Sequence, residues 1–349
     1  MTFDNSRLGM FVRQNTALIA AVTILALLWC IYNLLHPKGF SSAVLIQNSN
    51  ESVAIVFVAM AQTIPVLLGG LDLSVGAVMT LANCVASELL YGSPLQIAFG
   101  AFLTLAIGAG FGLMNGVIIV YGRLQPIIAT LATGSVAIGL ALFIRPLPGG
   151  EVDDDLSWAL TNDLYELVAT YGWWDPDAAW FAPFAPVPMP LLIMIIVAFG
   201  VWIPFKRTVL GRTVYAIGSA EGAAFMSGLP IDRAKLAAFT LAGFFAACGG
   251  LYLAIQTSSG NADITQAGSY TLNSIAAVVL GGTSLLGGIG GAIGSLVGAL
   301  LLRMMAFYFR ILSIDPLLQP LIEGMVLLGA VSLSALRTIS VKNRLSLFR

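Results

Sequence analysis

The octet Gly69-Gly70-Leu71-Asp72-Leu73-Ser74-Val75-Gly76 sets one carboxylate and a pair of glycines between two long apolar runs. These runs, 53–68 and 73–90, are each long enough, or nearly so, to cross the roughly 30 Å hydrocarbon core of a bilayer. A charge at such a place is a candidate for a functional or structural role. We therefore interpret the octet as the turn of a membrane hairpin.

The composition of the chain agrees with a membrane location. Of its 349 residues, 58% are hydrophobic and 9% are charged, whereas soluble domains carry about 25% charged residues. Because lipid offers no partners to backbone amides and carbonyls, the apolar runs are expected to be helices. The sequence therefore predicts an all-α polytopic membrane protein, with a single transmembrane domain over residues 1–349.

Ten apolar runs predict ten membrane crossings. They cover residues 16–35, 53–68, 73–90, 97–121, 127–144, 189–205, 236–255, 272–286, 292–309 and 317–336. Cytoplasmic loops retain lysine and arginine, and this sets the orientation. With the N-terminus inside, twelve of the 16 lysines and arginines lie in cytoplasmic segments, three lie outside and Arg303 lies within a span. Both termini are therefore predicted to be cytoplasmic.

The segment 145–188 is predicted to lie outside and is long enough for a function of its own. It carries eight carboxylates interleaved with four tryptophans, Trp158, Trp173, Trp174 and Trp180. One interpretation is an interfacial cap whose aromatic rings lie at the headgroup level. The other is a docking surface for an external partner, with tryptophans as anchors and carboxylates that steer its approach.

The segment 206–235 is predicted to be cytoplasmic and to contain a short helix. The helix is expected to start at Ser219 and to end at Gly228, just before Leu229-Pro230. Phe225 and Met226 belong to a small apolar knob on it. A helix of this length suits the groove of another protein; the alternative is a helix that lies flat on the membrane.

Two short motifs recur along the chain. Asp72-Leu73-Ser74 is echoed by Asp263-Ile264-Thr265 at an offset of 191 residues, and Leu124-Gln125-Pro126 by Leu318-Gln319-Pro320 at an offset of 194. In the predicted topology the two members of each pair enter the membrane from opposite sides. The pattern indicates an inverted repeat, which places a transport pathway between the two halves.

Few ionisable residues fall within the predicted spans: Glu88, Arg303 and Glu323, with Asp72 at the inner margin. Arg303 and Glu323 lie at the same depth, about 9 Å below the outer face at 1.5 Å per residue, so we expect a structural ion pair between them. Asp72 is expected to cap the third span, where a carboxylate meets free backbone amides. The structural set of the octet is Gly70, Asp72, Ser74 and Gly76.

Uncharged polar residues within the spans are better candidates for touching a solute. Amides and hydroxyls hold a neutral polyhydroxy molecule without burying a charge, although many such groups bond neighbouring helices instead. The residues predicted to line a translocation path are Asn83, Asn115, Gln125, Thr130, Asn273 and Gln319.

These features together resemble a known family. The motifs are Gly70 to Gly76, Met114-Asn115-Gly116, Gln125 to Leu131, Gly211-Arg212 through Gly218, and Gly281-Gly282-Thr283-Ser284-Leu285 with Gly287-Gly288. They are similar to permease subunits of bacterial ATP-binding cassette (ABC) sugar importers of the ribose, xylose, arabinose and galactofuranose type. The resemblance runs from the second span to the last. The acidic, tryptophan-rich segment 145–188 departs from the compact loop expected of that family.

The resemblance implies an inverted-repeat permease in the bacterial inner membrane that moves a pentose or hexose and performs no chemistry. It implies a second permease subunit, identical or different, a periplasmic sugar-binding protein and cytoplasmic ATP-binding subunits. ATP and Mg²⁺ would bind those subunits, and this chain would bind no cofactor or metal. The residues implied to couple to the ATPase are Ser219, Ala220, Glu221, Gly222, Ala223, Phe225 and Gly228.

Other functions remain open at this point. Importers of nucleosides, autoinducers or polyols share the same design. A secondary transporter or channel needs a titratable group in the middle of the membrane, for which Glu88 and Glu323 are poorly placed. An intramembrane enzyme would need a catalytic motif that the sequence lacks, and no nucleic-acid partner is expected.

Overall fold

A computed structural model describes residues 16–326, 328–329 and 332, and within them nearly all regular structure is helical. Seven helices are long and apolar enough to cross a membrane. They are α2 (Thr16–Leu35), α3 (Ser42–Leu67), α5 (Pro94–Tyr121), α6 (Pro126–Ile144), α9 (Met189–Arg207), α11 (Ile231–Thr257) and α13 (Ala292–Ile311). The prediction of an all-α polytopic membrane protein is confirmed.

The remaining helices are shorter. They are α4 (Val75–Leu89), α7 (Asp154–Thr161), α8 (Leu164–Tyr171), α10 (Val209–Met226), α12 (Ile264–Leu280) and the 3₁₀ turn η1 (Pro316–Leu318). Residues 319–326 continue from η1 as a helix, and the rest of the tenth predicted run lies largely outside the described residues. The count of ten crossings and the cytoplasmic position of both termini stay predictions.

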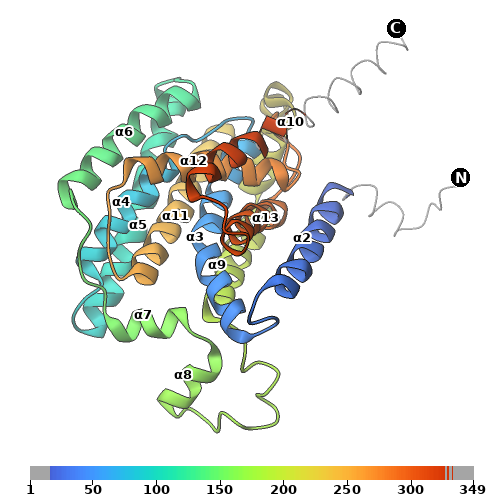
Figure 1. Cartoon of the computed structure of the whole chain (residues 1–349). Coiled ribbons are helices and arrows are strands. Elements are labelled where there is room, and N and C mark those ends of the chain that lie inside the picture. The colour runs from blue at the N-terminus through green and yellow to red at the C-terminus, as the bar shows by residue number, and fades with distance from the viewer. Residues whose placement is uncertain (1–15, 327, 330–331, 333–349) are drawn as a thin grey trace, which may run out of the picture.

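Helix α3 begins eleven residues before the apolar run that predicted it. Ser41 precedes it in an extended conformation, and its hydroxyl accepts a hydrogen bond from the Val44 N–H. The added segment is polar, but protein surrounds most of α3 (Figure 1). Its polar side chains therefore bond within the bundle, as the Ser52 hydroxyl does to the Asn48 carbonyl at 2.6 Å. Hydropathy alone does not reveal such a start.

Helices α3 and α11 interlock two halves of the chain. Helix α3 packs against α11, α12 and α13, and α11 packs against α3, α4 and α5. Each long central helix therefore makes its main contacts with helices that are distant in the sequence. This arrangement agrees with the predicted repeat, because α3 and α11 precede its two members, Asp72 and Asp263.

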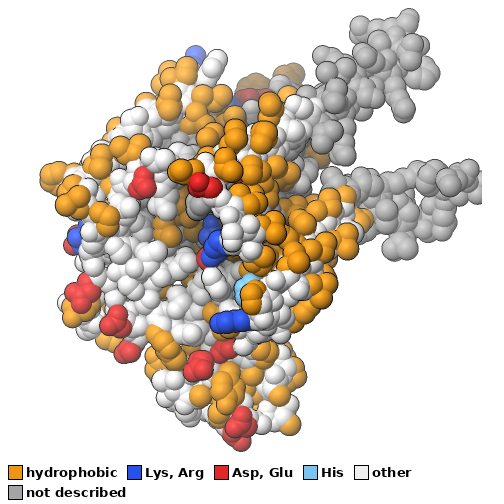
Figure 2. Space-filling view, in the orientation of Figure 1, with side chains coloured by type: hydrophobic (Ala, Val, Ile, Leu, Met, Phe, Trp, Pro, Cys, Tyr) orange, Lys and Arg blue, Asp and Glu red, His pale blue; other side chains and the backbone are white. Residues whose placement is uncertain are grey.

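The outer surface of the bundle is apolar, as contact with lipid requires. Exposed side chains on α2 and α6 include Leu34 and Phe143. Figure 2 shows hydrophobic side chains across much of the visible face, with charged side chains in small groups. The exposed apolar surface is therefore a lipid-facing or subunit-facing surface.

Glycines allow α5 and α11 to approach closely. A β-carbon added to Gly112 would lie 2.1 Å from the Phe239 carbonyl oxygen, and one added to Gly108 would lie 2.7 Å from the Gly243 carbonyl oxygen. Backbones in direct contact give a tight interface without any side chain between them. Gly110, on another face of α5, has open space around it.

We expect Gly112→Ala to destabilise the bundle by about 1–3 kcal/mol, because the added methyl group forces α5 away from α11. Gly110→Ala is the matched control and should leave stability unchanged or slightly higher, because alanine favours helix. The measurement is the apparent melting temperature of each purified variant in detergent. Equal melting temperatures for the two variants would contradict the close packing described.

Candidate functional site

The octet forms the turn between α3, which ends at Leu67, and α4, which begins at Val75. Asp72 is buried, and its Oδ1 accepts hydrogen bonds from the Ser74 N–H at 2.8 Å and from the Ser74 hydroxyl at 2.5 Å. The predicted cap is therefore wrong in its detail. Asp72 stabilises the turn before the helix and does not bind the free amides of the first helical turn.

The Ser74 hydroxyl joins this turn to a buried network of amides and hydroxyls. Asn115 on α5 donates from Nδ2 to Ser74 Oγ at 2.9 Å, and Thr133 on α6 donates to Asn115 Oδ1. The Thr130 hydroxyl accepts a hydrogen bond at 2.9 Å from the Leu73 N–H. Because buried polar groups are costly unless they are bonded, the network fixes the turn against α5 and α6.

Gln62 of α3 contacts the backbone of the turn at Asp72. This residue was not identified from the sequence. Its side-chain nitrogen lies 2.8 Å from the Asp72 carbonyl oxygen, and its side-chain oxygen lies 3.2 Å from the Asp72 amide nitrogen. The signal in the sequence is an amide inside the apolar run 53–68. Such an amide needs partners within the protein, because lipid provides none.

The residues predicted to line a translocation path fall into two groups. Asn83, Asn115 and Thr130 are buried and bonded within the bundle. Gln125 is exposed at the start of α6, while Asn273 and Gln319 line one polar cavity. The transport role of all six stays a prediction. In this conformation the second group is the one that a solute can reach.

The predicted ion pair between Arg303 and Glu323 is wrong in its partners. Arg303 Nη2 lies 2.7 Å from Glu51 Oε2, and Arg310 also pairs with the Glu51 carboxylate. Glu323 instead accepts hydrogen bonds from Asn273 at 3.0 Å and from Gln319 at 2.7 Å. The sequence prediction failed because Glu51 lies in the polar start of α3, which was placed outside the membrane.

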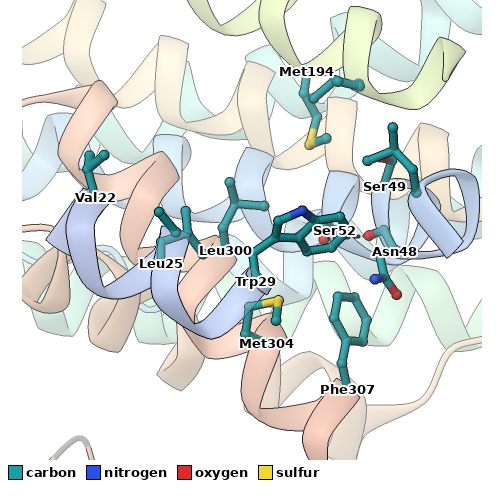
Figure 3. Close-up of a pocket in the computed structure, with 13 residues that line it drawn as sticks. Val22, Leu25, Trp29, Asn48, Ser49, Ser52, Met194, Leu300, Met304 and Phe307 are labelled. Atoms are coloured by element: carbon teal, nitrogen blue, oxygen red, sulfur yellow. Dashed lines mark hydrogen bonds between the residues drawn. The ribbon is translucent and has the colours of Figure 1, made fainter. Parts of the chain in front are cut away.

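A larger cavity of about 320 Å³ lies between α2, α3, α9 and α13. Figure 3 shows Trp29, Met194 and Phe307 reaching toward one another around it, with Asn48 and Ser52 at one end. Nearly all of its wall is apolar. A polyhydroxy solute finds few hydrogen-bond partners here, so the cavity does not match the chemistry of a sugar site.

The segment 206–235 differs from the single short helix predicted. Helix α10 breaks at Ala220, whose φ of −166° and ψ of 96° are not helical, and a second short helical segment follows up to Met226. Ser219 ends the first part, since its hydroxyl donates back to the Tyr215 carbonyl at 2.9 Å. Phe225 and Met226 are 71% and 85% exposed, so the predicted apolar knob is free to contact a partner.

An ion pair holds the second part of α10 against the start of α11. Lys235 Nζ lies 2.5 Å from Glu221 Oε1. In the first part, the Tyr215 hydroxyl donates to the Gly290 carbonyl at 2.9 Å. Burial raises the pKa of Tyr215 to about 12, so this hydroxyl keeps its proton at neutral pH. Both ends of α10 are therefore fixed to the bundle.

A junction of three glycines, Gly69, Gly218 and Gly287, links α10 to the octet. A β-carbon on Gly218 would lie 2.0 Å from the Leu67 carbonyl oxygen at the end of α3. A β-carbon on Gly287 would lie 2.8 Å from both Gly218 Cα and the Gly69 amide nitrogen. The Gly288 N–H also donates to the Leu67 carbonyl at 3.0 Å. The three segments therefore meet backbone to backbone.

The segment 145–188 has a packed part and an exposed part. The Ser157 hydroxyl of α7 donates to the Ile255 carbonyl at 2.7 Å, which fixes α7 to α11. Helix α8 and the chain after it extend away from the bundle (Figure 1). There Trp173, Trp174 and Trp180 form an exposed aromatic cluster with centroids 5.6 to 6.0 Å apart. The cap and docking interpretations both stay open.

Comparison with known proteins gives one coherent group. A family model described as the permease component of branched-chain amino acid transport systems matches residues 45–331. The ribose import permease of Haemophilus influenzae is 31% identical over 94% of this chain and 95% of its own length. That of Bacillus subtilis is 34% identical over 88% and 90%. The D-allose permease of Escherichia coli is 27% identical over 90% of this chain and 89% of its own length. No solved structure matches.

We expect Asn115→Leu to destabilise the protein by about 1–3 kcal/mol, because it removes the amide that joins the Ser74 and Thr133 hydroxyls in a site closed to water. Thr104→Val is the matched control on the same helix. Thr104 is equally buried, but its hydroxyl donates only to the Gly100 carbonyl of its own helix. Melting temperatures in detergent check the difference, and a larger loss for Thr104→Val would count against the network.

Proposed function

This chain belongs to the family of ABC-importer permeases, and from that premise we propose that it imports a monosaccharide across the bacterial inner membrane with energy from a separate ATPase. Support for the family comes from a match over residues 45–331. Support for a sugar as cargo comes from relatives named as ribose and allose permeases, which align over about nine-tenths of the chain or more.

The observation that carries the proposal is the connection between the exposed end of α10 and the octet. Phe225 and Met226 present an apolar surface on the side predicted to be cytoplasmic. Through α10, this surface is continuous with Gly218, which contacts the end of α3. A partner that binds the knob and changes its own shape with ATP therefore has a direct route into the core of the bundle.

The mechanism that follows is a change in the balance between two conformations. The ATP-binding subunits would bind one arrangement of α10 more tightly than the other, and this difference in affinity sets how far they shift the balance. The interlocked helices α3 and α11 would move with the halves they contact. The chain itself performs no chemistry, and ATP and Mg²⁺ would bind the partner subunits.

The proposed assembly follows the family design. It contains two permease subunits, identical or different, with ATP-binding subunits on the cytoplasmic side and a sugar-binding protein on the periplasmic side. A proton-coupled secondary transporter is a weaker candidate, because the carboxylates considered for it are bonded. Glu88 pairs with Arg145 at 2.6 Å, and Glu323 accepts hydrogen bonds from Asn273 and Gln319.

Reconstitution into liposomes tests the function. The permease is combined with the ATP-binding subunit and solute-binding protein encoded beside it, and uptake of labelled D-ribose, D-allose and L-leucine is measured with and without ATP. We expect ATP-dependent uptake of one of the sugars. Leucine uptake without sugar uptake would assign an amino-acid importer, and ATP-independent uptake would favour a secondary transporter or channel.

We expect Gly218→Ala to lower the amount of sugar imported per ATP hydrolysed several-fold, because its methyl group would separate α10 from α3 at a cost of about 1–3 kcal/mol. Gly200→Ala on the neighbouring helix α9 is the matched control, since nothing lies within 4 Å of a β-carbon there. Uptake and ATP hydrolysis are measured in the same liposomes. The same ratio in both variants would show that the glycine junction has no part in coupling.

A further inference from the structure

We propose that a polar cavity between α12, α13 and the helix that starts at Gln319 is a binding site for a neutral polyhydroxy solute on its way through the protein. The proposal rests on the function proposed above and adds the place and the chemistry of contact. The cavity holds about 240 Å³, close to the lower end of the roughly 300–1,000 Å³ of small-molecule sites.

The cavity lies within the membrane on the side that carries α7 and α8. Arg303 at its wall is eight residues from the end of α13 at Ile311, which corresponds to about 12 Å at 1.5 Å per residue. Ionisable groups at this depth are costly unless they face a partner or a water-filled path. Arg303 meets this requirement by pairing with Glu51, and it lies at the wall of the polar cavity and not against lipid alone.

The charges around the cavity cancel one another. Glu51 pairs with Arg303 and with Arg310 at one side, and Glu323 accepts two amide hydrogen bonds at the other. Two guanidinium groups and two carboxylates leave no net charge to hold an ion. The surroundings of the cavity therefore suit a neutral molecule.

Several polar groups remain to bind such a molecule. Glu323 takes the amide nitrogens of Asn273 and Gln319, which leaves their side-chain oxygens as acceptors. The Ser269 and Tyr270 hydroxyls line the same cavity, and Arg303 Nε is buried with no partner among the described residues. The wall also contains apolar side chains such as Leu302. A sugar offers both hydroxyls and apolar C–H faces, so it matches this mixture.

The polar wall of the cavity continues onto the exposed start of α12, which also carries the apolar Ile264. Thr265, Gln266 and Ser269 are exposed on its first two turns, where a lipid-facing helix would carry apolar side chains. Polar side chains here indicate contact with water or with a second subunit. In either case the cavity is reached from an aqueous route.

A zwitterionic amino acid fits less well. It would need an unpaired cation and an unpaired anion at fixed places. Here Arg303 and Arg310 both pair with Glu51 already, and a ligand carboxylate would have to compete with Glu51 for them. Hydroxyls and amide oxygens are the groups left free, and they favour a sugar.

Protection of an introduced thiol tests the cavity directly. Ser269→Cys, in a Cys30→Ser background, is labelled in the assembled complex with a membrane-impermeant thiol reagent added from outside. The other native cysteines, Cys84 and Cys248, are buried. We expect D-ribose or D-allose to slow labelling roughly tenfold at a concentration ten times its Kd, as occupancy requires. Thr257→Cys, exposed outside the cavity, is the control and should not be protected.

The same complexes are assayed for uptake with Asn273→Leu, and with Gln96→Leu as the amide control outside the cavity. We expect Asn273→Leu to lower the import rate at saturating binding protein roughly three- to tenfold, as for the loss of one neutral hydrogen bond, and the control to match the unmodified chain. Protection by leucine but not by sugar, no protection by either, or unchanged import in Asn273→Leu would each overturn the proposal. Wild-type complexes that import no sugar would refute the proposed function, while the protection assay would still decide the cavity.

Discussion

The buried position of α3 is the constraint on which the rest of the structure depends. Along most of its length α3 touches neither water nor lipid, so the polar side chains on it depend on partners within the protein. Gln62 binds the turn at Asp72, and Thr63 donates to Ser295 of α13 at 2.6 Å. Asn50 at its polar start donates to the Thr161 carbonyl of α7 at 2.7 Å. Helices from both halves are therefore assembled around one central element.

Hydropathy predicted the helices well because lipid leaves the backbone no alternative. It misplaced those features that depend on contacts between distant segments. The start of α3 at Ser42 was missed because its polar side chains are accepted only inside the bundle. The same error hid Glu51, which lies in this polar start, as the partner of Arg303. The break at Ala220 lies one residue after the predicted helix start at Ser219, but the helical part before it, from Val209, was not predicted. Local composition carries none of these long-range contacts.

The repeat found in the sequence has a structural counterpart. Asp72 accepts a hydrogen bond from the backbone N–H of Ser74, two residues on, and Asp263 accepts one from that of Thr265 at 2.8 Å. The two helices that follow also meet, since the Gly76 N–H donates to the Thr271 hydroxyl at 3.0 Å. The two motifs thus share one hydrogen bond but differ in its place, since Asp263 caps α12 directly whereas Asp72 lies two residues before Ser74, the N-cap of α4. The helices that follow them, α4 and α12, pack on each other.

The glycine junction has a mechanical consequence. A contact made of side chains can adjust to a displacement of one helix, because the side chains change rotamer. Gly69, Gly218 and Gly287 have no rotamers, and the surrounding backbones are already in contact. The junction therefore joins α10 to the end of α3 without adjustable side chains. A displacement of α10 that is not taken up elsewhere must therefore displace the end of α3 as well.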